Sequence, residues 1–328
     1  MKFKTELKNN VRPIVDEGIF GKMNHLLTRN IIYAQRGLEE ILNRDFFVIA
    51  GVLNPSIVHL GTKVLFDEIK FFQKCGKKVV ISAADIEAQS VKGISEGDFK
   101  EDFEKIFIPY LESSGVDIGN IDFMYQSNQL GRYFKRGISL GRLIDQRKFE
   151  RIFGTNKFSH YQSFLMTLSD LVYAQETNSS SALIVGGINQ DPNVSFIRDI
   201  LRKAKGINLP AGIYHRFMRG MNGGKMTRKK INSYIVLSDD EVTIQKKINR
   251  SRSGGGSTLE EHRRNGGNLE EDAMIEILGY TLEDEVVFQD ICSKYESGVL
   301  TSGELKKIGT QHVIEVLRRY RGVGKANV

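Results

Sequence analysis

Apolar residues along this chain follow two periodicities that alternate with each other. Between segments with apolar residues at helical spacing, such as 63–74 and 99–112, stand continuous apolar runs. Such runs are typical of strands buried on both faces of a sheet, and they occur at 46–51, 78–84, 121–125, 182–185 and 211–215. Strands that alternate with helices predict an α/β fold whose strands are parallel and joined by right-handed crossovers.

The two ends of the chain differ from its middle. Apolar residues at helical intervals between Leu26 and Leu42 predict a helical lead-in that packs on the sheet. The glycine-rich segment 251–257 predicts a flexible break, and the capping-box patterns at 258–261 and 301–304 predict a helical tail. We therefore expect a helical lead-in over 1–44, an α/β domain over 45–237 with a helical insertion at about 127–180, and a helical domain over 238–328.

Composition narrows the class of protein. The chain has 328 residues and a formal charge of +7, which favours a polyanionic partner. Its apolar runs are too short to span a bilayer and it shows no apolar leader, so we expect a soluble cytoplasmic protein with no membrane partner. Cys75 and Cys292 lack the spacing of a disulfide framework or a zinc site, so no structural metal is expected.

The first candidate for chemistry is the turn His59-Leu60-Gly61-Thr62, between an apolar run and a helical segment. A strand that turns through glycine into a helix can hold phosphate, because backbone N–H groups and the helix dipole point at the anion. The imidazole of His59 could add a hydrogen bond, and Gly61 would let a flat base lie against the backbone. An ordinary strand-to-helix turn fits the spacing equally well.

A second candidate stands where the run 78–84 ends. Asp85 and Glu87 follow this predicted strand directly. Ligands of open α/β sheets sit outside the carboxyl ends of strands, so these carboxylates are candidates for a binding site. The alternative is that Asp85 caps a helix while Glu87 interacts favourably with the dipole of that helix.

Three later segments carry further candidates. After the run 182–185, the glycines of 186–190 permit close approach to a ligand, and the segment also supplies two amide side chains. The loop 221–230 combines two glycines with four cations and could close over a triphosphate, or be only a basic surface turn. The basic, aromatic stretch 131–158 could grip nucleic acid, although a helical pair with an aromatic core and solvated charges is more common.

Taken together, these segments resemble the class I aminoacyl-tRNA synthetases, whose two signatures are known as HIGH and KMSKS. The resemblance extends over nearly the whole chain and is closest to the tryptophanyl-tRNA synthetases of archaeal and eukaryotic type. It implies a Rossmann-like parallel-sheet catalytic domain and an α-helical C-terminal domain that contacts the anticodon. The matching segments are LLTRNIIYAQRGLEEIL at 26–42, VVISAADIEA at 79–88, INQDPNVSFIRDI at 188–200, GGKMTRKK at 223–230, and GGSTLEEHRRNGGN and SGVLTSGELKK in the tail.

The resemblance also implies an activity. A homodimeric ligase would activate tryptophan with ATP and Mg²⁺ to the adenylate and would then transfer it to tRNA. Glu87 could accept the indole N–H of the amino acid. The family positions would make His59, Thr62, Lys225 and Arg228 catalytic; they would place Gly51, Gly61, Gly187, Asn189 and Met226 on ATP or the adenylate, and Glu87, Gln190, Ser82 and Thr167 on the amino acid.

Several residues depart from the family pattern. Thr62 stands where the second His of HIGH is usual, Thr227-Arg228-Lys229 replaces Ser-Lys-Ser, and Asn189 replaces an Asp. Ser82 and Thr167 occupy positions where glutamine often helps to hold tryptophan. Two alternatives therefore remain open: a paralogue that activates another aromatic amino acid outside translation, and a non-catalytic RNA-binding relative.

Overall fold

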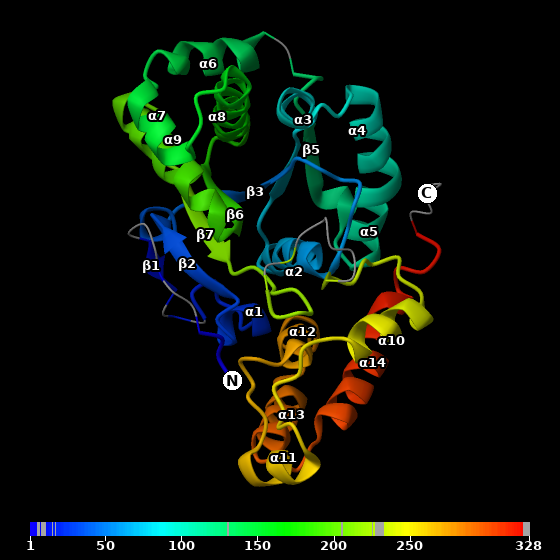
Figure 1. Cartoon of the computed structure of the whole chain (residues 1–328). Helices are drawn as coiled ribbons and strands as arrows, with labels where there is room; N and C mark the ends of the chain where they lie inside the picture. The colour runs from blue at the N-terminus through cyan, green and yellow to red at the C-terminus, as the bar shows by residue number, and fades with distance from the viewer. Residues whose placement is uncertain are drawn as a thin grey trace.

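The computed structural model consists of an α/β part and a helical part, which lies at the bottom of Figure 1. The structure describes residues 1–4, 7, 11–14, 16, 18–129, 131–204, 206–224, 226 and 233–323. None of the helices within these ranges is both long and apolar enough to cross a membrane.

The α/β part is built on one seven-stranded sheet with the order β1-β2-β7-β6-β3-β4-β5. The five strands from β7 to β5 are parallel, which confirms the prediction from the five apolar runs. The strand order reverses between β3 and β6, and ligands of open sheets bind at such a point. The strands are β1 (Arg12–Pro13), β2 (Ile32–Arg36), β3 (Phe46–Val52), β4 (Val79–Ala83), β5 (Ile121–Tyr125), β6 (Ser181–Gly187) and β7 (Ala211–His215).

The prediction of a helical lead-in over 1–44 is wrong for residues 32–36. These residues form β2, which pairs antiparallel with β7 and extends the sheet. The helices beside it are short, α1 (His25–Thr28) and η1 (Leu38–Glu40). Four of the five residues of β2 are buried, so the strand lacks the alternation of a half-exposed strand, and periodicity cannot separate such a run from a buried helix.

Helices cover both faces of the sheet. Successive residues of β3 point to opposite faces, so that Val48 packs in the core beneath α2 while Phe47 and Ile49 pack against α7, α8 and α9. Figure 1 shows α6 to α9 together at the top of the molecule, away from the helical part. The helices of this part are α2 (Leu60–Lys74), α3 (Asp85–Lys92), α4 (Glu96–Asp102), the π-helix η2 (Phe103–Phe107), α5 (Ile108–Ser113), η3 (Ile118–Asn120), α6 (Arg132–Gly141), α7 (Gln146–Phe153), α8 (Phe158–Asn178), η4 (Ile188–Gln190) and α9 (Asp191–Lys203).

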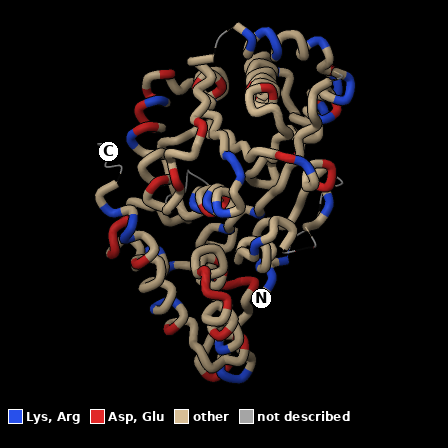
Figure 2. Tube along the Cα trace, turned by 180° about the vertical axis from the view of Figure 1, so that it is seen from behind, with Lys and Arg blue, Asp and Glu red and all other residues tan. Residues whose placement is uncertain are grey.

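The basic, aromatic stretch 131–158 is the predicted helical pair, α6 and α7. Tyr133 and Phe149 are almost fully buried, whereas most of the Lys and Arg residues of the stretch are exposed. Figure 2 shows several Lys and Arg positions along the helices at the top of the molecule. Phe158, at the start of α8, is 74% exposed. The aromatic residues inside the pair therefore belong to the core.

The C-terminal part is helical, as predicted. The hydroxyl of Thr301 accepts from the backbone N–H of Glu304, and the carboxylate of Glu304 accepts from the backbone N–H of Thr301, so the predicted capping box begins the last helix. The ammonium group of Lys306 in that helix donates to the carbonyl oxygens of Asn249 and Ser251. The helices are α10 (Glu241–Asn249), α11 (Leu259–Asn265), α12 (Ala273–Thr281), α13 (Glu285–Glu296) and α14 (Ser302–Arg318).

The prediction of a flexible break at 251–257 is wrong. A Cβ on Gly254 would lie 2.1 Å from the carbonyl oxygen of Asn268, and one on Gly255 would lie 2.2 Å from Oγ of Ser302. The backbone N–H of Gly254 donates to Oδ2 of Asp272 at 3.0 Å. These glycines therefore serve close packing between loops of the helical part.

Candidate active site

A cavity of about 470 Å³ lies at the carboxyl ends of β3, β4, β6 and β7, where the strand order reverses. Its walls come from these strands and from α2, α3, α7, α8 and α9. The volume falls in the range of about 300–1,000 Å³ that is usual for small-molecule sites. The predicted site residues that line it are Gly51, Gly61, Thr62, Ser82, Glu87, Thr167, Gly187 and Gln190.

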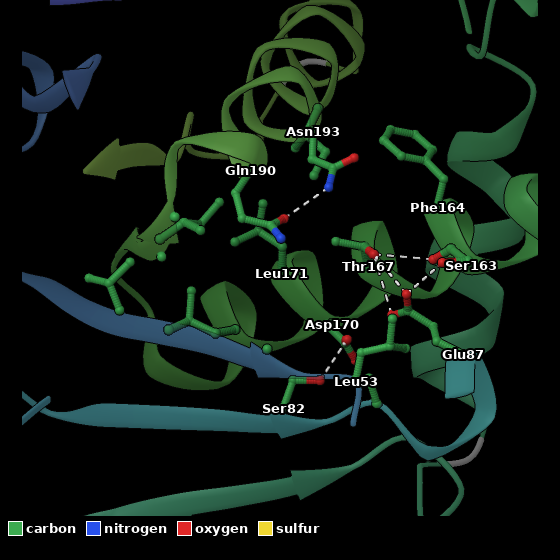
Figure 3. A pocket seen from close by; sticks show the side chains of 18 of the residues that line it. Leu53, Ser82, Glu87, Ser163, Phe164, Thr167, Asp170, Leu171, Gln190 and Asn193 are labelled. Atoms are coloured by element: carbon green, nitrogen blue, oxygen red, sulfur yellow. Dashed lines mark hydrogen bonds between the residues drawn. The ribbon is translucent and has the colours of Figure 1, made fainter. Parts of the chain in front are cut away.

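One half of the cavity is an apolar slot with polar groups at its base. Two neighbouring acidic side chains, Glu87 and Asp170, lie at the base of the slot (Figure 3). Such a slot suits a flat apolar group that carries a few hydrogen-bond donors. The apolar walls are formed by Phe149, Phe153, Phe164, Leu171 and Ile197.

Glu87 accepts several hydrogen bonds in this half. Oε2 accepts from Oγ of Ser163 at 2.7 Å, and Oε1 accepts from Nε2 of Gln126 at 2.7 Å. The hydroxyl of Thr167 lies 3.3 Å from Oε1. Burial and the neighbouring charge of Asp170 raise the pKa of Glu87 to about 7, although the hydrogen bonds oppose this shift. The carboxyl group is therefore poised to change its charge near neutral pH.

Asp170, in α8, is a site residue that the sequence interpretation missed. Its Oδ2 accepts from Ser82 Oγ at 2.7 Å and from Nε2 of Gln126 at 2.8 Å, and its Oδ1 accepts from the hydroxyl of Tyr133 at 2.6 Å. Burial raises the pKa of Asp170 to about 6. Ser163, Thr167 and Asp170 form a polar stripe at i, i+4 and i+7 of a helix whose other buried residues are mostly apolar, and this stripe was the available signal.

The two carboxylates after β4 have different roles. Asp85 accepts from the backbone N–H of Ile86 and from Oγ of Ser127 at 2.6 Å, so it ties the start of α3 to the loop after β5. Glu87, two residues later, faces the cavity (Figure 3). Asp85 is the first residue of α3 and not its N-cap, which is Ala84 without a side-chain hydrogen bond, so the predicted cap is wrong. Glu87 lies where the binding-site alternative requires it, in the cavity wall.

The other half of the cavity is lined by glycines. Gly51 lies at an open position, since a Cβ there would have no atom within 4 Å. Gly187 lies against the ring of Phe217, where a Cβ would clash at 2.6 Å. Gln190 accepts from Nδ2 of Asn193 at 3.0 Å through its Oε1, which leaves its amide nitrogen on the cavity side (Figure 3). Asn189 lies next to Gly187 but does not line the cavity.

His59 begins α2 as its N-cap. Its Nδ1 accepts from the backbone N–H of Thr62 at 3.2 Å, and the hydroxyl of Thr62 accepts from the backbone N–H of His59 at 3.4 Å. The strand-to-helix turn is thus self-capped, and Gly61 and Thr62 line the cavity while His59 does not. Met226 lies over the same turn, with its sulfur 3.7 Å from where a Cβ of Gly61 would be. The predicted residues Lys225 and Arg228 lie outside the described residues.

Comparison with known proteins gives a consistent family. The family model described as class I tRNA synthetases (W and Y) matches residues 42–318. Tryptophan–tRNA ligase of Methanocaldococcus jannaschii is 32% identical over 96% of this chain and 90% of the relative. The cytoplasmic tryptophan–tRNA ligase of Arabidopsis thaliana is 29% identical over 94% of this chain and 83% of its own. The crystal structure of tryptophanyl-tRNA synthetase from Aeropyrum pernix superposes with a TM-score of 0.89 at 26% identity, covering 95% of this chain and 89% of that one.

Proposed function

Because the chain belongs to the class I tRNA synthetases of the tryptophan and tyrosine type, we propose that it is a tryptophan–tRNA ligase. It would join tryptophan to ATP to form the adenylate and then transfer the aminoacyl group to tRNA. The observation that supports this best is the single cavity in which an apolar slot with two carboxyl groups meets the glycine-lined turn at the start of α2. The named relatives favour tryptophan over the two alternatives that the sequence left open.

The apolar slot is the proposed amino-acid site. The flat walls around Phe164 suit an indole, and Glu87 and Asp170 are acidic groups able to accept from the indole N–H and from the ammonium group. Ser82 and Thr167 use their hydroxyls to hold these carboxyl groups. Hydroxyl-bound carboxylates would thus take the part that glutamines have in the family pattern.

The glycine-lined half is the proposed ATP site. Gly51, Gly61 and Gly187 let the nucleotide approach the backbone, and the N-terminal end of α2 favours its negative charge. His59 would keep the first turn of α2 in shape through the capping box. We also propose that Asn189 and Met226 lie near the bound nucleotide and that Lys225 and Arg228 contact its phosphates.

The proposed reaction needs no nucleophile from the protein. A carboxylate oxygen of the amino acid forms a bond to the α-phosphorus of ATP, and the bond from that phosphorus to the bridging oxygen breaks, so that pyrophosphate leaves with the electron pair. Catalysis then rests on positioning and on cations that offset the developing charge. The described residues offer no group of three or more His, Cys, Asp or Glu side chains that could hold a metal. We propose that Mg²⁺ would bind together with ATP through its phosphates and would offset part of the developing charge.

The remaining parts of the proposal concern partners. The helical domain would contact the tRNA anticodon, and the exposed Lys307, Arg318 and Arg319 of the last helical segment would favour the phosphate backbone. A homodimer would form through the α/β domain, and the enzyme would work in the cytoplasm. We propose the domain limits expected from the sequence, 45–237 and 238–328; α10, which begins at Glu241, is the first helix of the second of these ranges.

The deciding experiment is exchange of labelled pyrophosphate into ATP with each of the twenty amino acids, followed by charging of a tRNA with a CCA anticodon. The proposal predicts exchange with tryptophan and charging of that tRNA alone. Exchange with a different aromatic amino acid, and none with tryptophan, would support the paralogue instead. ATP and tRNA binding without any exchange would support the non-catalytic relative.

A further inference from the structure

A buried histidine–glutamate pair lies beside the cavity and has no part in the function proposed above. Nδ1 of His215, the last residue of β7, is 2.9 Å from Oε1 of Glu68 in α2. The side chain of Glu68 is fully buried, and that of His215 is 10% exposed. His215 lines the cavity, so the pair connects the cavity wall to the core beneath α2.

This pair is an unfavourable way to fill a core. Burial raises the pKa of Glu68, and His215 only partly opposes this effect. Oε2 of Glu68 has no hydrogen-bond partner in the described part of the chain. Burying a carboxyl group with an oxygen that has no partner costs free energy, so packing alone does not account for the pair.

The geometry fixes the direction of the imidazole. The two ring nitrogens of histidine point in different directions, so with Nδ1 on Glu68 the other nitrogen, Nε2, is left for the cavity. Strand register places His215 directly beside Gly187 of β6. On α2, Gly61 and Leu65 line the cavity and Glu68 lies on the same helical face, at i, i+4 and i+7. His215 is thus next to Gly187 and is joined through Glu68 to the helix that carries Gly61.

The neighbouring Phe217 supports this placement. Phe217 is 49% exposed; its ring lies against Gly187 and stands edge-on to the ring of His215, with centroids 6.3 Å apart. An exposed aromatic face next to a directed imidazole nitrogen offers a planar surface and a polar contact together, which suits a nucleoside.

We propose that His215, oriented by Glu68, is a nucleotide-binding residue whose Nε2 hydrogen-bonds the nucleoside part of ATP. The inference rests on the proposed ATP-dependent function. His215 would touch the substrate, and Glu68 would be a positioning residue that acts through it.

The test compares His215→Ala and Glu68→Gln with the matched control His160→Ala. His160 also lines the cavity and comes from α8, the helix that supplies Thr167 and Asp170 to the proposed amino-acid site. ATP binding is measured by calorimetry without amino acid, and the KM values for ATP and tryptophan are measured by pyrophosphate exchange. His215→Ala should weaken ATP binding about tenfold and leave the KM for tryptophan within about twofold. Glu68→Gln keeps the shape and one hydrogen bond, so it should weaken ATP binding about threefold. His160→Ala should not change ATP binding.

Parallel measurements with 2′-deoxy-ATP and 3′-deoxy-ATP identify the group contacted. If a ribose hydroxyl is the partner, the wild-type protein binds one analogue more weakly than ATP, and His215→Ala loses this difference. If the base is the partner, removing a ribose hydroxyl changes the affinity of the wild-type protein and of His215→Ala by the same factor. Wild-type ATP affinity in folded His215→Ala and in Glu68→Gln, with only their melting temperatures lowered, would overturn the inference and leave the proposed function standing. Failure of the wild-type protein to bind ATP would overturn the proposed function and this inference with it.

Discussion

Glu87 of α3 and Asp170 of α8 share one hydrogen-bond donor, because Nε2 of Gln126 lies 2.7 Å from the first carboxyl group and 2.8 Å from the second. Burial raises the pKa values of both acids; the charge of Asp170 adds to the shift of Glu87, and the charge of Asp85 adds to the shift of Asp170. The base of the proposed amino-acid site is therefore a carboxyl pair whose charge depends on pH near neutrality.

The first prediction concerns stability. The pKa of Glu87 is about 7 in the folded protein and 4.5 in the unfolded chain, so the folded state keeps a proton that the unfolded state loses. Stability from this group is present below pH 4.5 and is lost as the pH rises toward 7. Glu87→Gln should therefore raise the melting temperature at pH 8 more than at pH 5. An equal shift of the melting temperature at both pH values would show that burial does not raise the pKa of Glu87.

The second prediction concerns substrate binding. The proposed acceptors hold the N–H groups of tryptophan best when they are ionised, so affinity for tryptophan should rise between pH 6 and pH 8, around the pKa of Glu87 of about 7 and that of Asp170 of about 6. Equilibrium titration of tryptophan across this range measures the slope. Glu87→Gln should flatten it. An unchanged slope in that variant would assign the titration to another group.

The third prediction concerns the loop before the Lys225 signature. Gly223 has a φ of +82°, and a Cβ there would lie 2.8 Å from Cδ of Arg252, whose backbone N–H donates to the carbonyl oxygen of Met221 at 2.7 Å. Gly223→Ala should slow pyrophosphate exchange about tenfold, because strain of about 1–2 kcal/mol displaces the loop. Gly224→Ala is the matched control, since its Cβ would meet only Asn222 at an ordinary 3.6 Å. Equal rates for both variants would contradict this explanation.

The fourth prediction concerns the contact between the sheet and the helical part. Glu276 of α12 is 1% exposed and pairs with Arg216 at 3.1 Å and with Arg219 at 2.9 Å, just after β7. Glu276→Gln should lower the free energy of unfolding by about 3 kcal/mol, because it leaves two partly buried cations without an anion. The control is Asp290→Asn, which breaks the pair between Asp290 and Lys294; these side chains are 54% and 53% exposed. This variant should lower the free energy of unfolding by less than about 1 kcal/mol in denaturant titrations. Comparable losses would contradict the role given to burial.

The sequence by itself determined the local elements and the family. Apolar runs located the five parallel strands, and the capping box at Thr301 located the last helix, because both depend on residues close together in the chain. Glycine spacing also located the turn at Gly61 and the strand end at Gly187, which line one cavity. The motifs were sufficient for the family, which the match over residues 42–318 confirms.

Tertiary structure decided what depends on residues far apart in the chain. β2 became a strand because β7, about 180 residues later, supplied its hydrogen-bond partner. The glycine content around Gly254 and Gly255 predicts a flexible segment, but Asn268 and Ser302, which lie farther along the chain, pack against these glycines. The pairings of Glu87 with Asp170, through Gln126, and of His215 with Glu68 join separate elements. No local pattern records such contacts, since burial and charge coupling arise only when the elements pack together.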